Sequence, residues 1–177
     1  GSYSVMLTNA GGGFSATPDL AVTRWCSDVA RDDWGTFFYI RDVRSDMTWS
    51  AAYQPLRREP EGYQAMFGLD KVEFRQQIAG IASRMEVTIA PEDGVEIRRI
   101  WLANMTAAPR ELEVTSYAEV VLAPPQADAA HPAFSNLFVE TEFVPASDAL
   151  LASRRPRSAA GSRPWLVHTV AVQGHTI

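Results

Sequence analysis

The chain has 177 residues, a length that suits one domain and allows a substantial buried core. Hydrophobic residues make up 46% and charged residues 21%, the ordinary balance of a soluble globular protein. The net charge of −5 argues against a nucleic-acid partner or a general surface for anionic membranes. No apolar run approaches the roughly 20 residues that span a bilayer, so we expect no direct membrane insertion by this chain.

The ends of the chain and its single cysteine bear on its origin. Cys26 is the one cysteine, so no internal disulfide can form. The chain starts at Gly1 without an initiator methionine and shows no signal peptide, which predicts an excised fragment of a longer protein. No repeat and no internal boundary interrupt the sequence. We therefore predict a single β-sandwich module over residues 1–177.

Almost all predicted elements are β-strands. An aromatic and β-branched run over residues 37–43 and a short run over residues 47–51 predict two strands, with turn residues at 42–46 between them. The segment 91–94 carries a strong turn signal, Pro-Glu-Asp-Gly. Further strands are predicted at residues 71–75, 81–89, 95–102, 111–122, 138–143, 150–153 and 165–172.

The clearest alternation lies in residues 81–89, where every second side chain from Ile81 to Ile89 faces one way. In the 111–122 strand, Leu112 and Val114 share a face. Helical signal is weak and predicts one short turn near residues 131–138. Successive antiparallel strands with turns between them predict an all-β sandwich or barrel.

Residues 24–42 crowd two tryptophans together with several arginines and aspartates. Guanidinium donors, carboxylate acceptors and flat aromatic rings suit a neutral, hydroxyl-rich ligand such as a sugar. The same mixture also builds an ordinary strand–turn–strand unit, in which residues 32–35 form an Asx-type turn. Trp101 lies within an alternating strand and is expected to be buried. The candidate carbohydrate-binding residues are Trp25, Asp32, Asp33, Trp34, Arg41, Asp42 and Trp49.

Other chemistry finds little support. His131, His168 and His175 are not spaced as zinc ligands, so we expect no metal and no other cofactor. The glycines at 11–13 lack the following Lys-Ser/Thr and the helix of a phosphate loop. They form either a flexible turn or a bare backbone that a ligand can approach closely.

Three carboxylate pairs could resemble the catalytic pairs of glycosidases. Residues i and i+2 of a strand lie roughly 6.5 Å apart on one face, but glycoside cleavage needs two carboxyl groups that flank the bond. We therefore interpret these pairs as solvated and expect no catalytic residue. A stand-alone sugar-active enzyme would have to use His131, His168 and Glu119 as its acid–base set. The pairs are Asp32/Asp33, Glu111/Glu113 and Glu140/Glu142.

A series of motifs, taken together and in order, resembles the β-sandwich module of bacterial cyclic β-1,2-glucan synthases. The resemblance covers nearly the whole chain. Its motifs are Tyr3-Ser4-Val5-Met6-Leu7-Thr8-Asn9-Ala10-Gly11, Arg24-Trp25, Arg31-Asp32-Asp33-Trp34-Gly35, Tyr39-Ile40-Arg41-Asp42, Thr48-Trp49-Ser50-Ala51-Ala52-Tyr53-Gln54-Pro55, Ser116-Tyr117-Ala118-Glu119-Val120-Val121-Leu122 and residues 128–142.

The resemblance implies a galactose-mutarotase-like supersandwich, two antiparallel sheets packed face to face. It implies a parent protein with a glycosyltransferase region and a helical-barrel phosphorylase-like domain, at the cytoplasmic face of the inner membrane. The family's catalytic acid belongs to the barrel, so this chain is not expected to catalyse. The string Tyr117-Ala118-Glu119-Val120 resembles the module copy upstream of the one beside the barrel.

We therefore expect an accessory module that scaffolds neighbouring domains and can bind β-1,2-glucan. The alternative is a purely structural packing module that binds no sugar. Its mark would be an exposed apolar patch on a flat sheet face. Separation from its neighbours can also expose edge strands and give a homodimer of the fragment.

Overall fold

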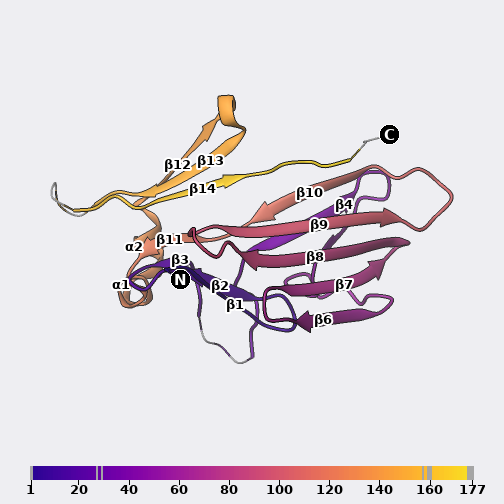
Figure 1. The fold of residues 1–177 in the computed structure, drawn as a ribbon, viewed down its shortest axis with the longest axis horizontal. Coiled ribbons are helices and arrows are strands. Elements are labelled where there is room, and N and C mark those ends of the chain that lie inside the picture. The colour runs from indigo at the N-terminus through magenta and orange to yellow at the C-terminus, as the bar shows by residue number, and fades with distance from the viewer. Residues whose placement is uncertain (1, 27, 29, 157, 159–160, 175–177) are drawn as a thin grey trace. The chain divides into compact units, whose positions relative to one another are not determined.

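The computed structural model describes residues 2–26, 28, 30–156, 158 and 161–174 (Figure 1). His175 and Gly1, which entered the predictions above, lie outside these residues. Antiparallel strands dominate the chain, which confirms the all-β prediction. The chain divides into a first unit (residues 1–18 and 23–119) and a second unit (residues 19–22 and 120–177). One module over residues 1–177 stays a prediction.

The first unit contains three groups of paired strands. β1 pairs with β2, one sheet has the order β10-β4-β5, and a larger sheet has the order β6-β7-β8-β9. The strands are β1 (Ser4–Leu7), β2 (Gly13–Ala16), β4 (Phe37–Asp42), β5 (Met47–Ser50), β6 (Tyr63–Phe67), β7 (Val72–Ile78), β8 (Ile81–Ile89), β9 (Glu96–Asn104) and β10 (Leu112–Tyr117).

The second unit contains a three-stranded sheet of order β12-β13-β14 and short helices. β3 (Ala21–Thr23) crosses the boundary between the two units in sequence. The elements of the second unit are β11 (Val120–Ala123), α1 (Pro125–Ala130), α2 (Pro132–Asn136), β12 (Val139–Val144), the 3₁₀ turn Pro145–Ser147, β13 (Ala149–Arg154) and β14 (Trp165–Thr169).

The core of the first unit follows from the alternation in β8. Ile81, Ser83, Met85 and Val87 are buried and Ile89 is half-buried, which confirms the predicted alternation up to Val87. β8 pairs with β7 on one side and β9 on the other. The largest core side chains come from two sheets. They form one cluster of Ile40, Trp49, Ala51, Ala52, Phe74, Ile78, Ile81, Met85 and Val87.

Several elements carried too little signal to be predicted. β1, β2 and β3 have only three or four residues each, too few to show alternation. Most side chains of β6 are exposed. α1 begins at Pro125, since proline fits the first turn of a helix, and its six residues are too few to show a helical period. The predicted strand 111–122 is two strands, β10 and β11.

Two tryptophans differ from their predicted environments. Trp49 is 0% exposed in the core, so it is not available to stack on a sugar and this candidate is wrong. Trp101 was expected to be buried but is 39% exposed. It lies opposite Arg84 in the β8–β9 register, on the face away from Met85, and its ring centroid is 4.6 Å from the Arg84 guanidinium carbon. The predicted alternation of β9 is confirmed at this position, but Trp101 lies on the solvent face and not on the core face.

Asp42 is also structural. It is 1% exposed, and its Oδ1 accepts hydrogen bonds from the backbone N–H groups of Arg44 (2.9 Å) and Ser45 (3.1 Å) in the β4–β5 turn. Its Oδ2 accepts a 2.6 Å hydrogen bond from Arg110 Nε. The Ser45 hydrogen bond, followed by the Arg110 contact, lowers the pKa of Asp42. The predicted sugar contact is corrected: this carboxylate is fully engaged in holding the turn.

A largely buried ion pair within β9 is hydrogen-bonded to the start of the chain. The Glu96 carboxylate pairs with Arg98, and the exposed fractions of the two side chains are 12% and 7%. Glu96 Oε2 also accepts hydrogen bonds from Ser15 Oγ (2.6 Å) and Tyr3 Oη (3.0 Å), while Arg98 Nη1 donates to the Thr36 carbonyl (2.8 Å). Burial alone would raise the pKa of Glu96, but the Arg98 charge and these hydrogen bonds outweigh it and lower the pKa.

We expect Arg98→Met to destabilise the protein by about 3 kcal/mol at neutral pH, because it leaves the Glu96 charge buried without its cation. The lowered pKa means that Glu96 stabilises the wild type above its unfolded-state pKa, and this contribution is lost as pH falls through the folded pKa. In the variant, protonation of Glu96 relieves the buried charge. The difference between the two proteins should therefore shrink in acid, as measured by urea unfolding. An equal difference at both pH values would contradict this assignment.

We expect Trp49→Ala to lower the free energy of unfolding by about 3–5 kcal/mol, because it leaves a large cavity in the core. Trp101→Ala is the matched control, and its exposed ring should cost no more than about 1 kcal/mol. Denaturant unfolding followed by circular dichroism measures both. Equal losses would mean that Trp49 is not a core residue.

Candidate functional site

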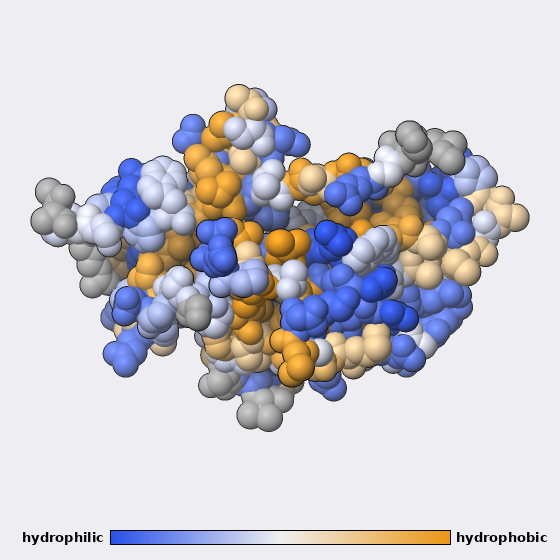
Figure 2. Space-filling model, in the orientation of Figure 1, coloured by the Kyte–Doolittle hydropathy of each residue, from blue (hydrophilic) through white to orange (hydrophobic). Residues whose placement is uncertain are grey.

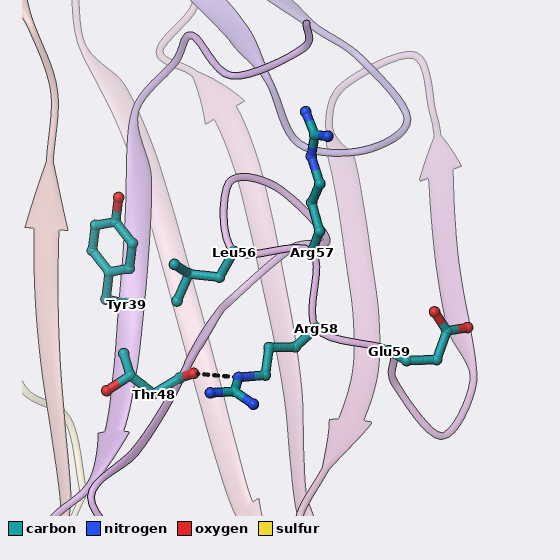
Figure 3. A pocket seen from close by; sticks show the side chains of 6 residues that line it. All are labelled: Tyr39, Thr48, Leu56, Arg57, Arg58 and Glu59. Atoms are coloured by element: carbon teal, nitrogen blue, oxygen red, sulfur yellow. Dashed lines mark hydrogen bonds between the residues drawn. The ribbon is translucent and has the colours of Figure 1, made fainter.

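The first unit has an open groove of about 620 Å³ beside β4 and β5 (Figure 3). Two of its residues come from these strands and four from the loop that follows β5. The groove is lined by Tyr39, Thr48, Leu56, Arg57, Arg58 and Glu59.

Strand alternation determines which side chains of β4 and β5 reach the groove. Ile40 and Trp49 lie opposite each other and point into the core. Their neighbours Tyr39 and Thr48 therefore point to the other face of the sheet. Arg41 shares this face, since it lies directly opposite Thr48 in the register. Burial of the core residues thus places the polar residues in the groove.

Hydrogen bonds hold the loop after β5 against the two strands. The backbone N–H of Leu56 donates to Ser50 Oγ (3.1 Å), and Arg58 Nε donates to the Thr48 carbonyl (3.0 Å). Arg57 Nε donates to Gln54 Oε1 (3.2 Å). In Figure 3 the side chains of Leu56 and Arg58 point toward Tyr39 and Thr48, whereas those of Arg57 and Glu59 point away.

The converging groups suit binding rather than bond cleavage. Tyr39 and Thr48 supply hydroxyls, Arg58 supplies guanidinium donors, and Leu56, 42% exposed, supplies an apolar surface. Burial raises the pKa of Tyr39, so its phenol stays protonated and neutral near pH 7. Glu59, the one carboxylate of the lining, points away from the hydroxyls (Figure 3). The groove therefore offers no pair of carboxylates that could flank a glycosidic bond.

The predicted residues are divided between two locations. Arg41 lies next to the groove, 43% exposed, and its guanidinium pairs with Asp46 and Glu113 at 2.8 Å each. Asp42 and Trp49 belong to the same two strands but are buried. None of the six lining residues was among the seven candidates. The signal that could have found them is the alternation around Ile40, together with the Arg-Arg-Glu run after Pro55.

Three other candidates contact the segment formed by β1, β2 and the turn between them. The Trp25 ring centroid is 5.6 Å from that of Phe14, and the Trp34 carbonyl accepts a 2.8 Å hydrogen bond from the Gly13 N–H. Asp32 Oδ2 accepts a 2.5 Å hydrogen bond from Thr8 Oγ1. All three side chains are partly buried, whereas Asp33 is exposed.

The Asp32 contact explains one of the glycines at 11–13. A Cβ at Gly12 would lie 2.0 Å from Asp32 Oδ1, so only glycine leaves room for this carboxylate. Gly11 has φ +94°, which favours glycine, and a Cβ there would lie 2.4 Å from the Ala52 Cβ. The protein's own side chains thus approach the glycine backbone closely. The predicted turn between two strands is confirmed.

No group of three or more metal-capable side chains occurs among the residues that the structure describes. Glu119 Oε2 forms an ion pair with Arg24 Nη1 at 2.5 Å, and Glu119 Oε1 accepts a hydrogen bond from the Tyr117 hydroxyl. Among the described residues, no helix is long and apolar enough to cross a membrane.

Comparisons with known proteins agree with the observed fold. The family model described as "Glycosyl hydrolase 94, supersandwich domain" matches residues 1–177. The chain is 40% identical over 170 residues to the cyclic beta-(1,2)-glucan synthase NdvB of Rhizobium meliloti (strain 1021), which covers 96% of the chain but 6% of that protein.

Two phosphorylases are also similar. Over 78 residues the chain is 36% identical to the 3-O-beta-D-glucopyranosyl-beta-D-glucuronide phosphorylase of Paenibacillus borealis, covering 44% of the chain and 10% of that enzyme. It is 25% identical over 120 residues to the N,N'-diacetylchitobiose phosphorylase of Vibrio furnissii, covering 66% of the chain and 15% of the enzyme. The chain therefore spans a small part of each of these relatives. Its antiparallel strands and the full-length match together show that it belongs to the glycosyl hydrolase 94 supersandwich-domain family.

Proposed function

We propose that this chain is an accessory module of a cyclic β-1,2-glucan synthase, and that the groove beside β4 and β5 holds β-1,2-glucan. The observation that carries the proposal is the 40% identity to such a synthase over 96% of the chain. In the proposed parent protein, the module scaffolds a glycosyltransferase region and a phosphorylase-like region at the cytoplasmic face of the inner membrane.

The chemistry of the groove fits this ligand. Glucan is neutral and rich in hydroxyls, so it needs donors and acceptors together with an apolar surface for its C–H groups. Tyr39, Thr48 and Arg58 provide the polar groups and Leu56 provides the apolar surface. In this proposal Arg41 extends the polar face, while Trp25, Asp32, Asp33 and Trp34 would form a separate contact near the β1–β2 segment.

A purely structural role is the second candidate, favoured by apolar side chains on the three-stranded sheet. Phe143 of β12 and Leu150 of β13 lie opposite each other in the register and are 54% and 49% exposed. A neighbouring domain of the parent protein could cover them. Such a module would pack against its neighbours and bind no sugar.

We expect linear β-1,2-gluco-oligosaccharides to bind the purified chain saturably in a calorimetric titration, and β-1,4 oligomers not to bind. Arg58→Ala should weaken binding about tenfold, because a hydrogen bond from a charged group contributes about 1.5 kcal/mol or more. Arg44→Ala is the matched control, since Arg44 is an exposed arginine in the β4–β5 turn outside the groove lining.

The same titration separates the possible contacts. If Trp34→Ala weakens binding and Arg58→Ala does not, the β1–β2 segment holds the glucan and the groove assignment is wrong. If no β-1,2 oligomer binds at millimolar concentration, the glucan-binding part of the proposal fails and the structural role is favoured.

A further inference from the structure

The three-stranded sheet of the second unit has a shallow pocket of about 350 Å³ on the face opposite Phe143. Two rows of side chains cross the strands there. Glu140 of β12 lies opposite Ser153 of β13, which lies opposite Trp165 of β14. The second row contains Glu142, Leu151 and Val167 in the same order. Neighbouring rows on one face lie about 6.8 Å apart, roughly the length of one sugar ring.

Arg163 organises the first row. Its Nε and Nη2 donate to Ser153 Oγ at 3.1 and 2.9 Å, and Nη2 also pairs with the Glu140 carboxylate. Ser153 is 1% exposed, so the guanidinium is held on a buried hydroxyl rather than on a mobile surface group. The guanidinium carbon lies 4.9 Å from the Trp165 ring centroid. The aromatic ring is therefore oriented before any ligand arrives.

The face nevertheless stays open. Trp165 is 53% exposed and Val167 is 65% exposed, so an aromatic ring and an aliphatic side chain lie side by side at the surface on β14. Such a strip beside polar groups is costly to leave in water. It is also the surface that the C–H face of a sugar ring covers well.

The charges of this face favour a neutral ligand. Arg163 carries one positive charge, while Glu140 and Glu142 carry two negative charges, which gives a net charge of −1. Phosphates, uronic acids and other anions are disfavoured there. At fixed positions, the carboxylates can accept hydrogen bonds from sugar hydroxyls, and the guanidinium can donate hydrogen bonds to them.

We propose that the face formed by Trp165, Val167, Glu140, Glu142 and Arg163 is a second saccharide-binding site, specific for neutral oligosaccharides. Trp165 stacks on the sugar ring, and the carboxylate of Glu142 accepts hydrogen bonds from its hydroxyls. Arg163 holds the indole and Glu140 in place. That β-1,2-glucan is the natural ligand rests on the proposed function above, whereas the site itself rests on this face alone.

The test is a titration of the complete chain with linear β-1,2-, β-1,3- and β-1,4-gluco-oligosaccharides, followed by the indole N–H signals in NMR spectra. The chain has five tryptophans, and Trp165→Phe identifies the signal of Trp165. We expect that signal to shift saturably with at least one neutral oligomer. The signal of Trp49, which is 0% exposed, serves as the internal reference and should not move.

Three variants test the face itself. Trp165→Ala should weaken binding at this site about tenfold, the effect of losing roughly 1.4 kcal/mol of interaction. Glu142→Gln, which keeps the shape but loses the charge, should weaken it severalfold. Phe143→Ala is the matched control, because Phe143 has a similar exposure of 54% but lies on the opposite face of the same sheet.

Each outcome decides one proposal. If β-1,2-glucan binds but the Trp165 signal and the Trp165→Ala affinity do not change, the second site is overturned, and the Arg58→Ala and Trp34→Ala titrations decide the groove proposal. If the Trp165 signal shifts with β-1,3 or β-1,4 oligomers only, the second site stands and the glucan assignment fails. If no neutral oligomer shifts the signal at millimolar concentration, or if Phe143→Ala weakens binding as much as Trp165→Ala, the second site is overturned.

Discussion

The packing of Trp49 and Ile40 with Phe74, Ile81 and Met85 is the contact on which the first unit depends. These side chains belong to two different sheets, and their burial determines which face of every neighbouring strand meets water. Tyr39 and Thr48 line the groove, and Arg41 lies on the same face, because Ile40 and Trp49 point into the core. A shift of one residue in β4 or β5 would exchange core and groove residues. The groove is thus a consequence of core packing, and its polar residues show no hydrophobic pattern of their own in the sequence.

Several charged residues in the first unit connect segments that are distant in sequence. Glu96 and Arg98 connect β9 to Tyr3, Ser15 and Thr36, and Arg110 connects the segment before β10 to Asp42. Buried pairs of this kind add little net stability, but each member becomes costly when its partner is removed. This explains why Asp42, a candidate sugar contact, is structural. An acidic or basic side chain beside an aromatic ring indicates a ligand only when it is exposed.

The two proposed saccharide sites rest on the same physical requirement, an apolar surface next to fixed polar groups. In the groove the apolar part is Leu56 and the polar part is Tyr39, Thr48 and Arg58. In the second unit the apolar part is Trp165 and Val167, and Arg163 fixes the polar part through buried Ser153. Neither site contains two carboxylates on opposite sides of a ligand, so both suit holding a chain rather than cutting it. This agrees with an accessory role beside catalytic domains in the proposed parent protein.

The sequence by itself determined the strands with long alternation, such as β8, and the all-β class, because a side-chain period of two is a local property. It also determined the family, because a series of motifs in a fixed order can be recognised without knowing which residues they contact. Only the tertiary structure decided that Trp49 and Asp42 are buried, that Trp101 is exposed, and that residues 56–59 complete a groove. Alternation says that two faces differ but not which face meets the core, and for Trp101 the prediction chose the wrong one. A groove built from two strands and the following loop depends on contacts between residues far apart in the sequence, and no local sequence pattern predicts such contacts.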